Sequence, residues 1–163
     1  MLRNRQLIPP LTIHTPDGHT VRAWDYKQKK NLVIAFLDTD CPPCEEFLRA
    51  LVASAAALRE KEATALLVFL EQPARRLTDA LPSGIIAGSD IRGNSARAFL
   101  GEDPFASRGY VHDGLFVTDR YGELFAQWAI ERHKFPAIAD ILAALDRVEM
   151  ACDECSTPLW AAD

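Results

Sequence analysis

The sequence lacks any long apolar run. A secretory signal or a membrane-spanning helix needs a continuous apolar stretch. The arginines in the opening segment MLRNRQLIPP are not followed by one. We therefore expect a cytoplasmic protein with no membrane partner.

The sequence also lacks an excess of charge of one sign. Its net charge is −5, and acidic and basic residues are interspersed along the chain. A protein that binds a nucleic-acid backbone usually carries a basic patch or stripe. The charge pattern therefore indicates no nucleic-acid partner.

Internal repeats, low-complexity segments and linkers rich in Pro, Gly or Ser are absent too. With 48% hydrophobic residues, a chain of 163 residues can bury a substantial core without disulfide bonds. We expect a single domain over residues 1–163, in which residues 150–163 form a C-terminal tail.

Four cysteines are present, as two Cys-x-x-Cys pairs: Cys41 with Cys44, and Cys152 with Cys155. In a reducing compartment, cysteines more often serve catalysis or metal binding than structural bridges. The spacing alone does not distinguish a redox pair from a zinc site.

Apolar patterning predicts alternating strands and helices. The segment LTIHTPDGHTVRAW has the signature of a hairpin with an Asp-Gly turn, and GLFVTDRYGELFAQWAI predicts a second hairpin. Three buried strands (NLVIAFL, TALLVFL and GIIAG) and a closing helix striped from Phe135 to Val148 complete the pattern. The order predicts an α/β fold with a mixed sheet and helices on both faces.

The first cysteine pair is placed where a strand gives way to a helix. Apolar residues recur at helical spacing from Phe47 to Leu58, and Pro42 suits a first helical turn. A helix N-terminus favours a thiolate, so Cys41 is the candidate nucleophile and Cys44 the resolving cysteine. The acids Asp38 and Asp40 oppose this effect.

Three segments resemble the thioredoxin-like superfamily, and within it the redoxin (AhpC/TSA) group that contains TlpA/ResA-type proteins and peroxiredoxins. They are TPDGHTVRAWDYKQKKNLVIAF, the CPPC motif and LFVTDRYGEL. The resemblance implies a thioredoxin-like three-layer α/β/α sandwich with an N-terminal β-hairpin extension. It also implies a thiol-disulfide oxidoreductase without a cofactor, which takes a protein or small-molecule disulfide and exchanges electrons with a thioredoxin- or reductase-type partner.

The chain departs from these relatives at several positions. His112 or Asp113 stands where thioredoxins and TlpA-type proteins have a cis-proline, and Ala35 stands where thioredoxins have a buried acid. The threonine and arginine of the peroxiredoxin site are replaced, the arginine by Asp113. Peroxiredoxins also lack the cis-proline, so an antioxidant, peroxiredoxin-like thiol peroxidase is the alternative function, although the replaced threonine and arginine argue against fast peroxide turnover.

The tail leaves three alternatives open for Cys152 and Cys155. The segment CSTPLW resembles the resolving-cysteine tail of two-cysteine peroxiredoxins, which predicts a relay to the first pair, within one chain or across a homodimer. The second alternative is a non-catalytic protein with zinc on Cys41, Cys44, Cys152 and Cys155. The third is a pair of free surface thiols.

Among the histidines, His112 is the candidate catalytic residue. It precedes a strand whose start packs near the cysteines in this fold, where an imidazole can stabilise a thiolate. We expect His14, His19 and His133 to be solvated surface residues.

Overall fold

The computed structural model of the protein describes residues 2–101, 113–130 and 133–150. Its elements are, in order, β1 (Thr12–His14), β2 (Thr20–Arg22), the 3-10 helix η1 (Ala23–Tyr26), β3 (Asn31–Leu37), α1 (Pro42–Ala53), α2 (Ala55–Glu60), β4 (Ala63–Phe69), α3 (Arg75–Thr78), β5 (Ile85–Ser89), α4 (Asn94–Leu100), β6 (Asp113–Thr118), β7 (Leu124–Ile130) and α5 (Ile138–Met150). Seven strands form one mixed sheet in the order β2-β1-β5-β4-β3-β6-β7.

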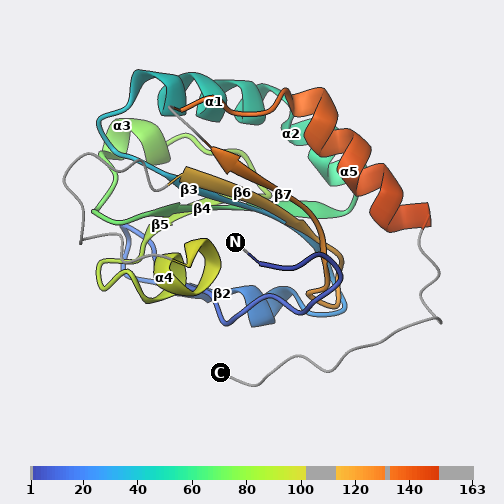
Figure 1. The fold of residues 1–163 in the computed structure, drawn as a ribbon. Helices are drawn as coiled ribbons and strands as arrows, with labels where there is room; N and C mark the ends of the chain where they lie inside the picture. Colours follow the sequence, from blue (N-terminus) through green and yellow to red (C-terminus); the bar gives the residue numbers. More distant parts are fainter. Residues whose placement is uncertain (1, 102–112, 131–132, 151–163) are drawn as a thin grey trace.

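Helices cover both faces of this sheet. Helices α1, α2 and α5 lie on one side, and α4 lies on the other (Figure 1). Strands β3, β4 and β5 are parallel, whereas β6 and β7 are antiparallel to their neighbours. The predicted three-layer α/β/α sandwich with an N-terminal hairpin, here β1 and β2, is confirmed.

The two central strands, β3 and β4, are buried along their whole length. Both consist mainly of apolar residues, which suits strands covered on both faces. They pair in parallel, so the chain crosses over between them through α1 and α2. This crossover starts from the carboxyl end of β3, where the Cys41 segment begins.

Strand alternation divides the apolar residues between two clusters. Val33, Ala35 and Leu37 of β3 face the cluster that includes the cysteines and the inner faces of α1 and α5. Ile34 and Phe36 face the α4 side, where the Phe36 ring packs against other buried aromatic rings. Each face of the sheet therefore has its own core.

Two helix boundaries differ from the prediction. The apolar stripe after the cysteines belongs to two helices, because the chain turns at Ser54 between α1 and α2. The apolar residues of both helices face the same side, so Leu58 of α2 is also buried. Phe135 precedes α5 and stacks on Phe47, with ring centroids 4.5 Å apart.

Among the described residues, no helix combines the length and the apolar character needed to cross a membrane.

Candidate active site

Cys41 is the N-cap residue of α1, as the sequence predicts. Its backbone is extended, and its Sγ accepts a hydrogen bond from the backbone N–H of Cys44 at 3.1 Å. Pro42 occupies the first helical position, where a missing N–H costs nothing because that group has no partner within the helix. Cys41 therefore places its sulfur against the Cys44 N–H at the start of a twelve-residue helix.

Cys41 and Cys44 are joined by a disulfide bond. Both residues are buried, with 3% and 2% of their surface exposed, and they belong to the core cluster under α1 and α5. The structure therefore shows the oxidised form of the pair.

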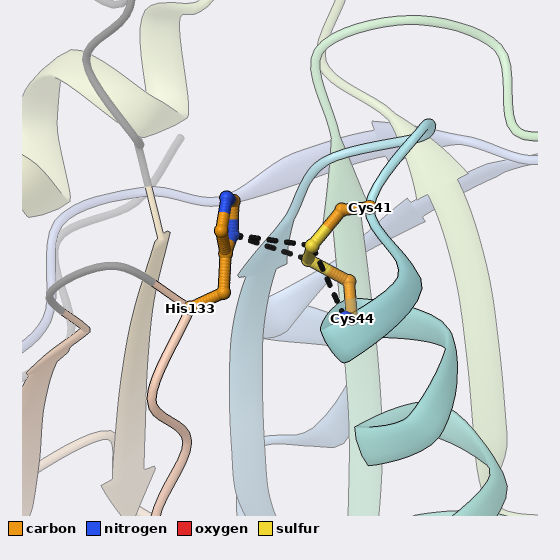
Figure 2. Close-up of side chains that lie close together, drawn as sticks. All are labelled: Cys41, Cys44 and His133. Atoms are coloured by element: carbon orange, nitrogen blue, oxygen red, sulfur yellow. Dashed lines mark hydrogen bonds between the residues drawn. A yellow bond between two sulfur atoms is a disulfide. The ribbon is translucent and has the colours of Figure 1, made fainter.

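His133 lies against this disulfide (Figure 2). Its Nδ1 is 3.1 Å from Sγ of Cys41 and 3.7 Å from Sγ of Cys44. The expectation of a solvated surface histidine is wrong, because His133 lies against the cysteine pair at the start of α1 and its side chain is only 26% exposed. The backbone of His133 has a φ of 56°, in the left-handed region that non-glycine residues seldom adopt. His14 and His19 are exposed, as predicted.

Asp113 is the third group at the site. One carboxylate oxygen, Oδ2, lies 2.7 Å from Nδ1 of His133 and 4.0 Å from Sγ of Cys44. The other oxygen, Oδ1, is buried without a hydrogen-bond partner among the described residues. The carboxylate is therefore only half satisfied.

Burial is the main reason why the pKa of Asp113 is raised, from 3.8 to about 6. The negative charge of Asp38 adds to the increase, whereas the hydrogen bond and charge of His133 act against it. Asp113 therefore exchanges its proton in a range where ordinary aspartates are fully ionised.

The β6–β7 hairpin explains how these groups meet. Asp113 pairs with Ile130 across the open end of the hairpin, so the chain that continues to His133 starts beside Asp113. Gly114 pairs with Phe36 near the end of β3, which places this open end at the edge from which Cys41 departs. Asp113 lies two positions before Leu115 on β6, so both side chains are on the same face of the sheet, the face that holds the cysteine cluster.

Other predicted site residues lie outside the described residues. These are His112, Cys152 and Cys155. The relay through the tail and the four-cysteine zinc site therefore remain predictions. The described residues contain no cis peptide bond, and Asp113, at one of the two positions proposed for the missing cis-proline, contacts the cysteine pair.

Within the described part of the chain, two groups of side chains have the composition of a metal site. The donor atoms of Cys41, Cys44 and His133 lie within 4.8 Å of one another, and so do those of Asp38, Asp113 and His133. The disulfide form offers no thiolate, so the first group could hold a metal only after reduction.

Comparison with known proteins agrees with this architecture. The chain is similar to a protein described as the thiol:disulfide interchange protein DsbE from Chlorobium tepidum, with 20% identity, a TM-score of 0.67, and coverage of 89% of this chain and 99% of that one. It is also similar to a 2-Cys peroxiredoxin from Plasmodium vivax, with 14% identity, a TM-score of 0.74, and coverage of 90% and 82%. Peroxidoxin BcpB from Mycobacterium tuberculosis shares 14% identity with a TM-score of 0.73, and 94% and 100% of the two chains are covered.

At these identities the structural likeness shows the fold. No curated protein matches the sequence. The model of the AhpC/TSA family matches residues 5–126, which is most of the chain and includes both cysteines of the CPPC motif. The chain therefore belongs to the AhpC/TSA family.

Proposed function

We propose that this member of a family of thiol oxidoreductases catalyses thiol-disulfide exchange with Cys41 as nucleophile and Cys44 as resolving cysteine. The observation that carries the proposal is the Cys41–Cys44 disulfide at the start of α1. In the reduced enzyme, the Cys41 thiolate attacks a substrate disulfide and releases one substrate thiolate. The Cys44 thiolate then attacks Sγ of Cys41, which releases the second thiolate and leaves the enzyme disulfide.

The surroundings of Cys41 favour its role as nucleophile. The backbone N–H of Cys44 in the first turn of α1 and the imidazole of His133 both face its sulfur, and each stabilises negative charge there. Asp38 and Asp113 add negative charge nearby, which limits this stabilisation. We infer a thiolate of moderate stability, suited to reducing disulfides rather than to acting as a strong oxidant.

Asp113 is placed to handle the proton of Cys44. Its Oδ2 is the carboxylate oxygen facing that sulfur, at 4.0 Å. Cys44 must lose its proton before it attacks the mixed disulfide, and a buried carboxylate can accept it. His133, which contacts both Asp113 and Cys41, would hold the carboxylate in position.

The reaction needs no organic cofactor, because the electron pair is stored in the cysteines themselves. The substrate is a protein or small-molecule disulfide, and a thioredoxin- or reductase-type protein is the proposed electron partner. The cysteines of the tail are proposed to relay electrons to Cys41 and Cys44.

Peroxide reduction is the second candidate, and family membership favours it. In that reaction peroxide oxidises the Cys41 thiolate to a sulfenic acid, and Cys44 condenses with it to give the same disulfide and water. Both candidates therefore end at the disulfide that the structure contains.

Parallel assays on one protein preparation separate the candidates. The reduced enzyme is mixed with oxidised glutathione or an aromatic disulfide, and separately with hydrogen peroxide. We expect rapid disulfide exchange, slow peroxide consumption, loss of exchange in Cys41→Ser, and a trapped mixed disulfide in Cys44→Ser. Fast peroxide turnover with little exchange would support the peroxidase, and full exchange activity in Cys41→Ser would refute the assigned nucleophile.

A further inference from the structure

The reduced active site would concentrate unusual negative charge in a buried place. Reduction adds two electrons and two protons to the disulfide and yields two thiols. If both thiols ionise, two thiolates lie beside the carboxylate of Asp113, with Asp38 close by. Burying several anions together is unfavourable unless protons or a cation neutralise them.

The donor atoms around this charge are of the kinds that a tetrahedral zinc site uses, and those of Cys41, Cys44 and His133 lie within 4.8 Å of one another. Nδ1 of His133 lies 3.1 and 3.7 Å from the two sulfurs. In a tetrahedron with metal–sulfur bonds of about 2.3 Å and metal–nitrogen bonds of about 2.0 Å, a nitrogen and a sulfur are separated by about 3.5 Å. The two observed distances lie on either side of this value.

Asp113 supplies the fourth donor. Its Oδ2 lies 2.7 Å from Nδ1 of His133 and 4.0 Å from Sγ of Cys44. Its Oδ1 is fully buried and has no hydrogen-bond partner among the residues described here. A buried carboxylate that is half unpartnered is an independent sign that this site can accept a positively charged ligand.

We propose that the reduced protein binds one zinc ion through Cys41, Cys44, His133 and Asp113, and that the oxidised protein does not. The proposal rests on the proposed function only in requiring that the cysteine pair can be reduced. Zinc binding releases the two thiol protons to solvent, and neutral His133 binds the metal through Nδ1 with its own proton carried on Nε2. Oxidation to the disulfide removes two of the four ligands, so zinc leaves.

Charge favours a divalent over a monovalent soft cation. Two thiolates and one carboxylate carry three negative charges. Binding of Zn²⁺ leaves the site with a net charge of −1, whereas binding of Cu⁺ would leave it with −2. Zinc also accepts sulfur, nitrogen and oxygen ligands together in a tetrahedral arrangement. The site differs from a four-cysteine zinc site in using no cysteine of the tail.

The experiment uses the full chain, reduced with a phosphine that is then removed under anaerobic conditions, and titrated with zinc chloride against a chromophoric chelator. We expect one zinc per chain in the reduced protein and no tight binding in the oxidised protein. His133→Asn and Asp113→Asn should each lower the zinc affinity on the order of 10- to 100-fold. Asparagine tolerates the left-handed backbone of His133, so this change removes the ligand with little strain.

Two controls test the ligand set. His14→Asn changes an exposed histidine on β1 and should leave zinc affinity unchanged. The double variant Cys152→Ser/Cys155→Ser should also bind zinc as the wild type does. Loss of zinc in the double variant, or unchanged affinity in His133→Asn, would overturn the proposed ligands.

X-ray absorption at the zinc edge of the reduced wild type gives a test that needs no variant. We expect two sulfur and two nitrogen or oxygen ligands, and four sulfurs would contradict the proposal, as would a reduced wild type that binds no zinc. Disulfide exchange measured in metal-free buffer is a separate result. Disulfide exchange without zinc binding would refute the metal site and leave the proposed function standing. Zinc binding without disulfide exchange would refute the proposed function and leave the metal site standing.

Discussion

The carboxylate of Asp113 lies 2.7 Å from Nδ1 of His133, and the two side chains meet beside the Cys41–Cys44 disulfide. Neither residue belongs to the CPPC motif. Asp113 is the first residue of the β6–β7 hairpin, and His133 follows the hairpin's last strand, so both lie at its open end. This pair links the charge state of a buried acid to the redox-active sulfurs.

Asp113 should make the oxidised protein less stable as the pH rises. Its pKa is about 6 in the folded protein and 3.8 in its ordinary state, so the folded chain holds this proton more tightly than the unfolded chain. The free energy of unfolding should therefore fall between about pH 4 and pH 6, by on the order of 2 to 3 kcal/mol. Urea unfolding of the oxidised protein across this range measures the effect.

The side chain at position 113 cannot ionise in Asp113→Asn, so the free energy of unfolding of this variant should not show this decrease. Asp79→Asn, which changes an exposed aspartate, should retain the wild-type profile. Identical pH profiles for Asp113→Asn and the wild type would show that Asp113 does not titrate in this range.

His133→Asn should slow the reaction of reduced Cys41 with iodoacetamide at pH 7, by roughly three- to tenfold. The imidazole contacts the Cys41 sulfur, and without it less of the thiol is ionised. The rate is measured from pH 5 to 10 by mass spectrometry of the labelled peptide, in metal-free buffer. The difference from wild type should vanish at high pH, where the thiol is ionised in both proteins; a difference that persists there points instead to altered access.

Gly114→Ala should destabilise the protein by about 1 to 2 kcal/mol. A Cβ at this position would lie 2.6 Å from Cδ2 of Leu100 and 3.1 Å from the ring of Phe116. Thermal and urea unfolding measure the loss. In a double-mutant cycle, Leu100→Ala should recover part of it by removing the clashing methyl group, and strictly additive effects would place the strain elsewhere.

The tail should exchange disulfides with the active site. In Cys44→Ser, mild oxidation should leave Cys41 linked to Cys152 or Cys155, because the normal resolving thiol is missing. Peptide mapping by mass spectrometry identifies the bond, and non-reducing electrophoresis shows whether it lies within one chain or joins two. In Cys44→Ser/Cys152→Ser/Cys155→Ser the same bond cannot form, and Cys41 should stay free or pair with added thiol. A Cys41 that remains unpaired in both variants would argue against the relay.

The cysteine pair could be predicted from sequence because its signals are local. A buried strand, an adjacent Cys-Pro-Pro-Cys and a helical stripe occur within thirty residues, and each reports on its neighbours. The proximity of His133 could not be read in this way, since 92 residues separate it from Cys41. It depends on strand order in the sheet and on a left-handed residue after β7.

Asp113 left a weaker signal in the sequence. It begins the strand segment Asp-Gly-Leu-Phe-Val, and side chains two positions apart on a strand share a face. Asp113 is two positions from the apolar Leu115, which predicts a carboxylate on a buried face of the sheet. A buried carboxylate is unusual enough to suggest a function. The sequence could not say that this face is the one that holds the cysteines.

The site joins two pieces of local structure: the cysteines belong to the β3–α1 unit, and the acid and histidine belong to the β6–β7 hairpin and the residues that follow it. The ladder between β3 and β6 fixes the register of one against the other. A slip of that ladder by one residue would turn Asp113 to the opposite face of the sheet while both pieces kept their own shape. The chemistry of the protein therefore depends on the register between β3 and β6. A screen for loss of activity should recover substitutions in these two strands that change no residue of the site.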